Sequence, residues 1–109
     1  MYGFNIEVKL VGTRPDNLDE MLDVVTDQLT LMCAREAEFE DFMVTRHTSG
    51  DATFLIVVNR DAEAMALTSA IMWLHTAVSE AGFATPGWLR SAEQVFEEES
   101  PGQAVAAGR

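Results

Sequence analysis

Cysteine, basic side chains and long apolar stretches are all scarce in this chain. Among its 109 residues Cys33 is the single cysteine, which excludes an intramolecular disulfide and favours a reducing compartment. The longest stretch without Asp, Glu, Lys or Arg runs from Ala64 to Ser79. As a helix it would span only about 24 Å, so we expect no membrane span. The N-terminus lacks the basic region and apolar run of a signal peptide, and we therefore expect a cytoplasmic protein.

The shortage of basic side chains also limits the partners. Seven Lys and Arg residues face eighteen Asp and Glu residues, which gives a formal net charge of −11. Such a chain repels phosphate backbones and anionic lipid headgroups, so direct nucleic-acid binding is not expected. The apolar content of 48% is in the globular range, and the length suits a single core.

Two clear periodicities open the chain. The segment from Tyr2 to Leu10 alternates apolar and polar side chains, and this period of two predicts a strand. From Leu18 to Met32 apolar residues recur at spacings of four and three, which predicts an amphipathic helix. Asn17 and Glu20 have the spacing of a capping box at its start, with Asp16 as an alternative cap.

A hairpin and a second helix follow. The segments Phe42 to His47 and Thr53 to Asn59 are rich in aromatic and β-branched residues, and the short polar loop between them predicts a hairpin. Asn59 or Asp61 is expected to cap the second helix, which ends where Gly82 supplies a stop.

The last patterned segment, Ser91 to Glu98, is compatible with a strand or a short helix, and we prefer an edge strand. The resulting order predicts an α/β (α+β) ferredoxin-like βαββαβ sandwich, with two helices on one face of an antiparallel sheet and strands one and three in its centre. We expect this single domain to span residues 1–99, with residues 100–109 as a flexible C-terminal tail.

The end of the second helix carries a resemblance. Residues 81–88 read Ala-Gly-Phe-Ala-Thr-Pro-Gly-Trp. From Phe4 to Trp88 the chain resembles small uncharacterised proteins of actinobacteria and their phages, in which such a helix ends in Ala-Gly-x-x-Thr-Pro-Gly-Trp. That family has no assigned activity, so the resemblance implies the fold and transfers no site. Glu93 and Glu97–Glu99 depart from the pattern expected of a final strand.

Residues capable of chemistry are few. A hydrolase-like grouping can be written from hairpin residues, namely His47, Thr48, Ser49 and Asp51. A working triad brings its partners from separate elements to an oxyanion hole, and no motif here supplies one, so we interpret the group as a polar hairpin. Cys33 continues the inner stripe of the first helix and is interpreted as packing. The chain has no metal-ligand spacing and no nucleotide-binding glycine motif, so no metal or cofactor is expected.

The apolar surface exceeds what one sheet can cover. The second helix has one stripe made of Leu67, Ile71, Leu74 and Val78, and another made of Met65, Met72, Trp73 and Ala77. The open sheet face raises the same question. Monomers rarely expose large apolar patches, so we expect self-association, most simply as a symmetric homodimer. The candidate residues for it are Leu55, Val57, Leu67, Ile71, Leu74 and Val78.

An acidic stripe repeats along the outer side of the first helix. It comprises Asp16, Glu20, Asp23 and Asp27. The stripe could occupy a basic groove on a partner protein, although a solvated helix face is the commoner origin of such a pattern.

Three hypotheses on function remain. The first is a noncatalytic homodimeric protein-interaction module whose acidic face is available to a basic partner. The second is an acidic phage-type inhibitor of a host nucleic-acid-binding protein. The third is a dimeric α/β ligand-binding protein or enzyme, in which His47 or His75 contacts a small molecule between paired sheets.

Overall fold

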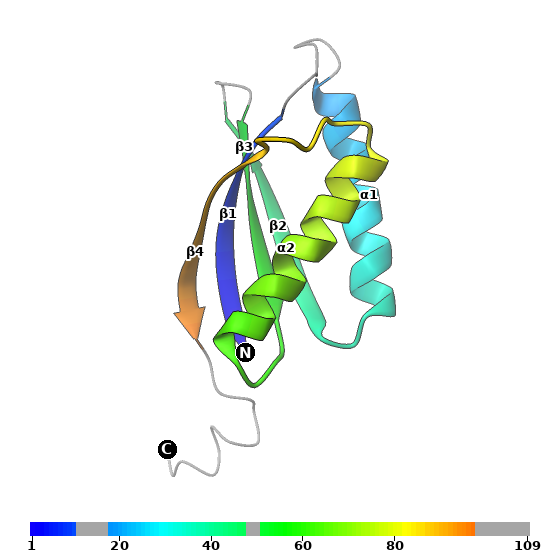
Figure 1. Ribbon diagram of the computed structural model, residues 1–109. Coiled ribbons are helices and arrows are strands. Elements are labelled where there is room, and N and C mark those ends of the chain that lie inside the picture. The colour runs from blue at the N-terminus through cyan, green and yellow to red at the C-terminus, as the bar shows by residue number, and fades with distance from the viewer. Residues whose placement is uncertain (11–17, 48–50, 98–109) are drawn as a thin grey trace.

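The protein folds as a ferredoxin-like sandwich, as the sequence predicts (Figure 1). The computed structural model describes residues 1–10, 18–47 and 51–97. Their elements in chain order are β1 (Tyr2–Lys9), α1 (Leu18–Arg35), β2 (Phe39–Arg46), β3 (Asp51–Val58), α2 (Glu63–Glu80) and β4 (Leu89–Glu97). The strands form one antiparallel sheet in the order β2-β3-β1-β4, and both helices cover the same face of it.

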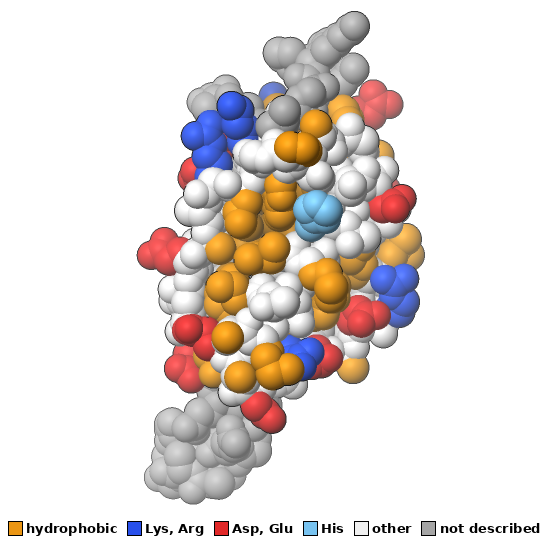
Figure 2. All heavy atoms as spheres, viewed as in Figure 1, with side chains coloured by type: hydrophobic (Ala, Val, Ile, Leu, Met, Phe, Trp, Pro, Cys, Tyr) orange, Lys and Arg blue, Asp and Glu red, His pale blue; other side chains and the backbone are white. Residues whose placement is uncertain are grey.

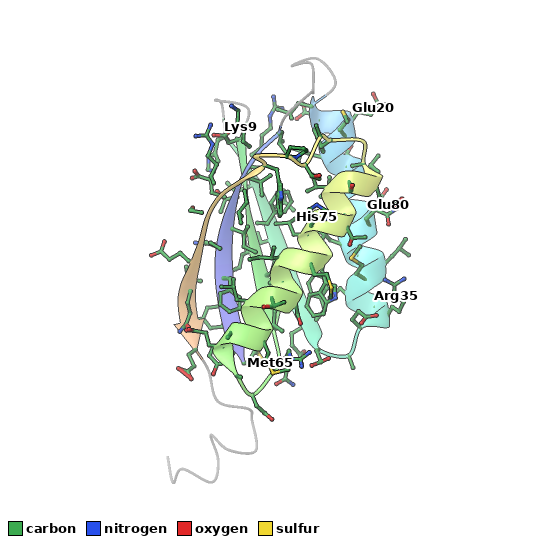
Figure 3. The ribbon with its side chains drawn as sticks, viewed as in Figure 1. Lys9, Glu20, Arg35, Met65, His75 and Glu80 are labelled. Atoms are coloured by element: carbon green, nitrogen blue, oxygen red, sulfur yellow. The ribbon has the colours of Figure 1, made fainter. Side chains whose placement is uncertain are left out.

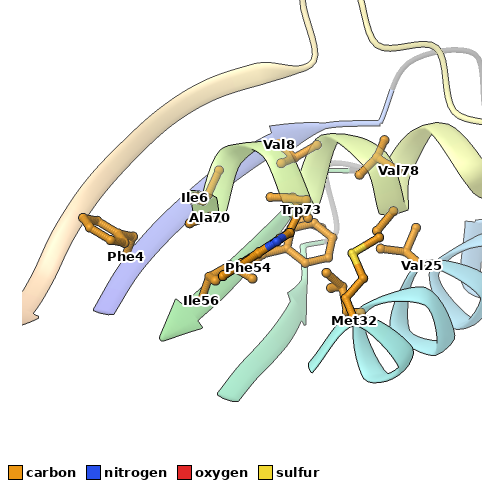
Figure 4. Close-up of a cluster of buried hydrophobic side chains, with 14 of the residues drawn as sticks. Phe4, Ile6, Val8, Val25, Met32, Phe54, Ile56, Ala70, Trp73 and Val78 are labelled. Carbon is orange, nitrogen blue, oxygen red and sulfur yellow. The ribbon is translucent and has the colours of Figure 1, made fainter. Parts of the chain in front are cut away.

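The core lies between the sheet and the helices. Every second residue of β1 and β3 is buried, and Phe4, Ile6, Phe54 and Ile56 are at most 1% exposed. The predicted apolar side of α1, from Leu18 to Met32, is buried against them. Figure 4 shows these side chains meeting Trp73 and Val78 of α2. The predicted edge strand is also confirmed, because β4 pairs with β1 from Leu89 to Glu97.

The end of α2 shows why the chain turns at Gly82. The Gly82 N–H donates to Ser79 O (3.0 Å) and the Phe83 N–H to Val78 O (3.2 Å). These two bonds form a Schellman motif, which needs a left-handed residue, and Gly82 has φ +92°. The segment that carries the resemblance thus ends a helix and leads into Trp88, whose ring lies 5.5 Å from His75.

Two local predictions differ from the structure. The capping prediction for α2 is wrong, because Ala62 is its N-cap, without a side-chain cap bond. Asn59 instead donates from Nδ2 to Glu40 Oε1 (3.3 Å). The hairpin also begins earlier than predicted, since β2 starts at Phe39, whose buried ring packs on Trp73. The predicted caps of α1, Asp16 and Asn17, lie outside the described residues, as does the predicted tail.

The pairing of β1 with β4 contains a close contact that the sequence pattern does not reveal. Gly3 lies opposite Phe96, and a β-bulge follows between Gly3 and Phe4. A Cβ atom on Gly3 would lie 2.1 Å from Phe96 Cε1, so the ring occupies the space that a side chain would fill. An aromatic ring over a glycine in the neighbouring strand shields the glycine backbone and fixes the register.

We expect Gly3→Ala to destabilise the protein by about 1–3 kcal/mol, because the new methyl group displaces the Phe96 ring. In a Phe96→Ala background the same change should instead stabilise by about 0.5–1 kcal/mol, since glycine within a strand costs conformational entropy. Urea unfolding of the four proteins measures both effects. Equal effects of Gly3→Ala in the two backgrounds would show that the ring does not occupy this space.

Candidate interaction surfaces

The open face of the sheet, opposite the helices, carries the odd-numbered residues of β1 and β3. Within β3, the alternating residues Phe54 and Ile56 point into the core, so Thr53, Leu55 and Val57 lie on the open side. The registers of β2 and β4 extend this face on both sides. The structure therefore places Leu55 and Val57 where the sequence expects them, and both are half-buried by their neighbours.

One half of this open face is apolar. Met43 lies directly opposite Leu55 and is 61% exposed. Val57 and the ring of Phe96 flank Gly3 in the next row across the sheet. These four residues, Met43, Leu55, Val57 and Phe96, are called the sheet patch below. An acidic side chain borders it at Asp41, opposite Val57.

The other half of the open face is polar and holds basic groups. Lys9 is exposed opposite Asp51, and Arg90 Nε lies 3.9 Å from Asp51 Oδ2. His47 Nε2 and Thr53 Oγ1 are 2.6 Å apart, and the His47 N–H donates to Asp51 O (2.9 Å). An exposed ion pair of this kind contributes at most about 1 kcal/mol, so it leaves the basic groups available to other carboxylates.

Two members of the predicted hydrolase-like grouping, His47 and Asp51, are among the described residues. Thr48 and Ser49 lie outside the described residues. The imidazole of His47 bonds to the hydroxyl of Thr53, while the carboxylate of Asp51 faces Arg90. Within the described ranges, no three His, Cys, Asp or Glu side chains gather as a metal site would require.

The buried side of α2 combines parts of both predicted stripes. Leu74 and Val78 from the first stripe, and Ala77 from the second, are fully buried in the protomer core. They are therefore not accessible to a second copy in this fold. Leu67 and Ile71 are partly buried and pack against the core beside them.

Trp73 explains this rotation of α2. Its ring stacks on Phe39 of β2, with centroids 4.7 Å apart and planes 6° from parallel. Met72, which precedes Trp73 in the chain, and Met65, seven residues before Met72, lie on the outer side and are left 57% and 53% exposed. Figure 2 shows hydrophobic side chains gathered over α2 on this face of the molecule.

The acidic stripe of α1 faces solvent where it is described. Glu20, Asp23 and Asp27 are all exposed, and Asp16 lies outside the described residues. The neighbouring Asp19 is a different case, because its carboxylate pairs with Arg46 at the end of β2. Two apolar side chains, Val24 and Leu31, are 38% and 62% exposed next to the stripe.

Sequence reasoning missed two hollows at the start of α2. The larger has a volume of about 290 Å³ and is lined by Arg60, Ala64, Met65, Thr68 and Ser69. The second, about 250 Å³, shares Arg60 and Met65 with it and extends to Glu38, which pairs with Arg60 (3.1 Å). Ser69 is 7% exposed, and its hydroxyl has no hydrogen-bond partner within the described ranges. The uncharged sequence around Ser69 gives no signal for such a hollow.

The comparisons with known proteins add little. No protein-family model and no curated protein matches the chain. Among solved structures it is similar to the crystal structure of an unknown protein from Galdieria sulphuraria, at 14% identity and a TM-score of 0.35. The match covers 92% of this chain and 48% of that one, so the chain spans about half the length of that protein. Across the described helices, none is long and apolar enough to cross a membrane.

Cys33 lies on the side of α1 that faces β2. Its Sγ–H donates to Phe39 O (3.2 Å), and the residue is partly buried against the core. Burial raises the pKa of the Cys33 thiol, and the charges of Asp41 and Glu40 raise it further. The reactive thiolate is therefore depleted at neutral pH.

We expect iodoacetamide to label native Cys33 at least about tenfold more slowly at pH 7.5 than the urea-unfolded chain, because both the raised pKa and the packing oppose attack. Mass spectrometry of timed samples gives the two rates, and the rate of a free cysteine in the same urea concentration corrects for the solvent. Equal corrected rates would contradict a protected thiol.

Proposed function

We propose that this chain is a noncatalytic homodimeric interaction module. It pairs with a second copy through the sheet patch and presents the acidic side of α1 to a basic partner. The sheet patch carries the proposal, because four apolar side chains gather on a face that no element of the described chain covers.

Burial of the sheet patch gives the driving force for association of two copies. Met43 is 61% exposed, and Leu55 and Val57, both on the central strand β3, form the middle of the patch. Fully burying a side chain of this size contributes about 1.5–3 kcal/mol through the hydrophobic effect. Met43 gains the most from association, and Leu55, Val57 and Phe96, which are already half-buried, each add a smaller amount.

The charges at the two ends of the open face favour a second copy as the occupant. Lys9 and Arg90 lie beside Asp51 at one end of the open face, and Asp41 lies at the other end, beyond the sheet patch. A two-fold axis through the patch can place the basic end of one protomer over the acidic end of its partner. In a symmetric contact of this kind the same apolar patch of both protomers meets, and opposite charges face each other at its ends.

One alternative has an observation in its favour. In paired sheets, the hydrogen-bonded His47 and Thr53 would lie near the interface, where they could contact a small ligand. A phage-type inhibitor role, which the resemblance of residues 81–88 suggests, uses only the acidic side of α1. A cytoplasmic location agrees with the unpaired Cys33.

The native protein should have twice its 12.0 kDa chain mass in multi-angle light scattering. We expect Leu55→Glu and Met43→Glu to give folded monomers, because two carboxylates would be buried near each other across the axis, at a cost that weakens the dimer at least about tenfold.

Met72→Glu is the matched control. Its methionine is about as exposed as Met43 but lies on α2, away from the sheet patch. This variant should remain dimeric, and circular dichroism verifies that all variants are folded. A native monomer at high concentration, or a monomer produced by Met72→Glu alone, would refute dimerisation through the sheet patch.

A further inference from the structure

The outer surface of the two helices carries a second exposed apolar group. On α2, Met65 and Met72 are seven residues apart, and on α1, Val24 and Leu31 have the same spacing. All four side chains are between 38% and 62% exposed. A spacing of seven places two residues on the same side of a helix, two turns apart. These four residues are called the helix-pair surface.

The two halves of this surface lie on the sides where the helices approach each other. Trp73 stacks on Phe39 of β2, the strand that lies beneath α1, so the Met72 side of α2 is directed toward α1. Met21 of α1 approaches Gly82 at the end of α2, and Figure 4 shows Met32 of α1 beside Trp73. Met72 and the exposed residues of α1 therefore border the same seam, and Met65 continues the apolar row of α2 toward its start, where Figure 3 shows the helices farther apart.

Carboxylates line the outer border of the helix-pair surface. Glu20 lies one turn before Val24, and Asp27 lies one turn before Leu31. Asp23 continues the acidic stripe between them, one turn before Asp27. Figure 3 shows Glu20 and Arg35 at opposite ends of α1, and the basic side chain of Arg35 is paired with Glu36 (3.2 Å). Along α1 an apolar row thus runs parallel to an acidic row.

The hollow of about 290 Å³ lies at the α2 end of this surface. Met65 forms one of its walls, and the buried hydroxyl of Ser69 lines it. Between Glu63 and Glu80 the helix carries no carboxylate and no Lys or Arg. A hollow with methionine and small side chains can accept an apolar anchor, because methionine adapts its shape to what it contacts.

We propose that the helix-pair surface binds a basic amphipathic helix of a partner protein. The apolar side of that helix contacts Met65, Met72 and Leu31, and its Lys and Arg residues face the acidic stripe of α1. Helices dock in such apolar seams through anchors spaced three, four and seven residues apart. The inference deepens the proposed function, in that it specifies the basic partner and where it binds.

The charge of the acidic stripe favours a basic helix over a second copy of the chain as the occupant of the helix-pair surface. Two copies meeting through the helix-pair surface would bring the acidic stripes of two chains of charge −11 close together, and like charges repel. A basic helix meets the same stripe with opposite charge, which favours its association and fixes its orientation.

A designed peptide of about 18 residues, with a leucine side and a lysine side, tests the proposal, because it matches α1 and α2 in length. Its counterpart carries glutamate in place of lysine. Fluorescence anisotropy at physiological salt should show binding of the Leu/Lys peptide to the native protein and at least about tenfold weaker binding of the Leu/Glu peptide.

Paired variants locate the site. Met65→Gln/Met72→Gln should weaken Leu/Lys binding about tenfold, with Leu31→Gln as a further apolar variant, whereas Leu89→Gln/Val95→Gln on β4 should change it less than about twofold. Asp23→Lys/Asp27→Lys should likewise weaken it about tenfold. Its control, Glu40→Lys/Glu93→Lys on the two edge strands, changes the net charge equally and should have an effect of only about two- to threefold.

Light scattering of the same samples separates this inference from dimerisation. Loss of peptide binding with an unchanged mass supports a partner site on the helices. The inference is overturned if the Leu/Lys peptide does not bind at about 0.1 mM protein, if each control weakens binding as much as its paired variant, or if Met65→Gln/Met72→Gln halves the mass and thereby identifies a second copy as the occupant. A monomeric native protein that still binds the peptide at this site would refute only the dimer.

Discussion

The stacking of Trp73 on Phe39 determines how α2 lies on the sheet. Phe39 belongs to the edge strand β2, so this contact ties the helix, which lies over the central strands β3 and β1, to the side of the sheet that α1 covers. Three alanines, Ala66, Ala70 and Ala77, are completely buried beneath the helix and allow its backbone to approach the strands closely. The same rotation leaves Met65 and Met72 on the outer side. The exposed methionines of the helix-pair surface therefore follow from the orientation of α2 that this aromatic contact fixes.

Most of the fold was predictable from periodicity. The alternation from Tyr2 to Lys9 and the spacing from Leu18 to Met32 each match a single element and a single buried side. The pattern of α2 was misleading, because its large apolar residues surround the helix and its buried side includes three alanines and a serine. Alanine adds little to a hydrophobic stripe, yet its small size is what allows close packing. Which large residues stay exposed then depends on Trp73, a tertiary contact.

The surfaces were predictable to different degrees. Leu55 and Val57 follow from the two-sided apolar character of β3, because a strand with apolar residues on both sides needs cover on both. Phe96 was not predictable as a member of the sheet patch, since its place over Gly3 depends on the register of β4 and on the bulge beside it. The hollow beside Ser69 likewise depends on Arg60, whose side chain approaches from the loop before α2. Strand alternation is local information, whereas register and loop placement are not.

The sheet patch and the helix-pair surface lie on opposite sides of the molecule, so the use of one does not cover the other. In a dimer paired through the sheet patches, both helical layers point outward, so each protomer keeps its helix-pair surface accessible. The acidic stripes are then separated by the full thickness of the paired sheets, which reduces the repulsion between two chains of charge −11. A partner with two basic helices could engage both protomers, and its second contact would form at the high effective concentration that a linker provides. Dimerisation on the helical side would remove both advantages, because it would bury the acceptor surface and bring the carboxylates together.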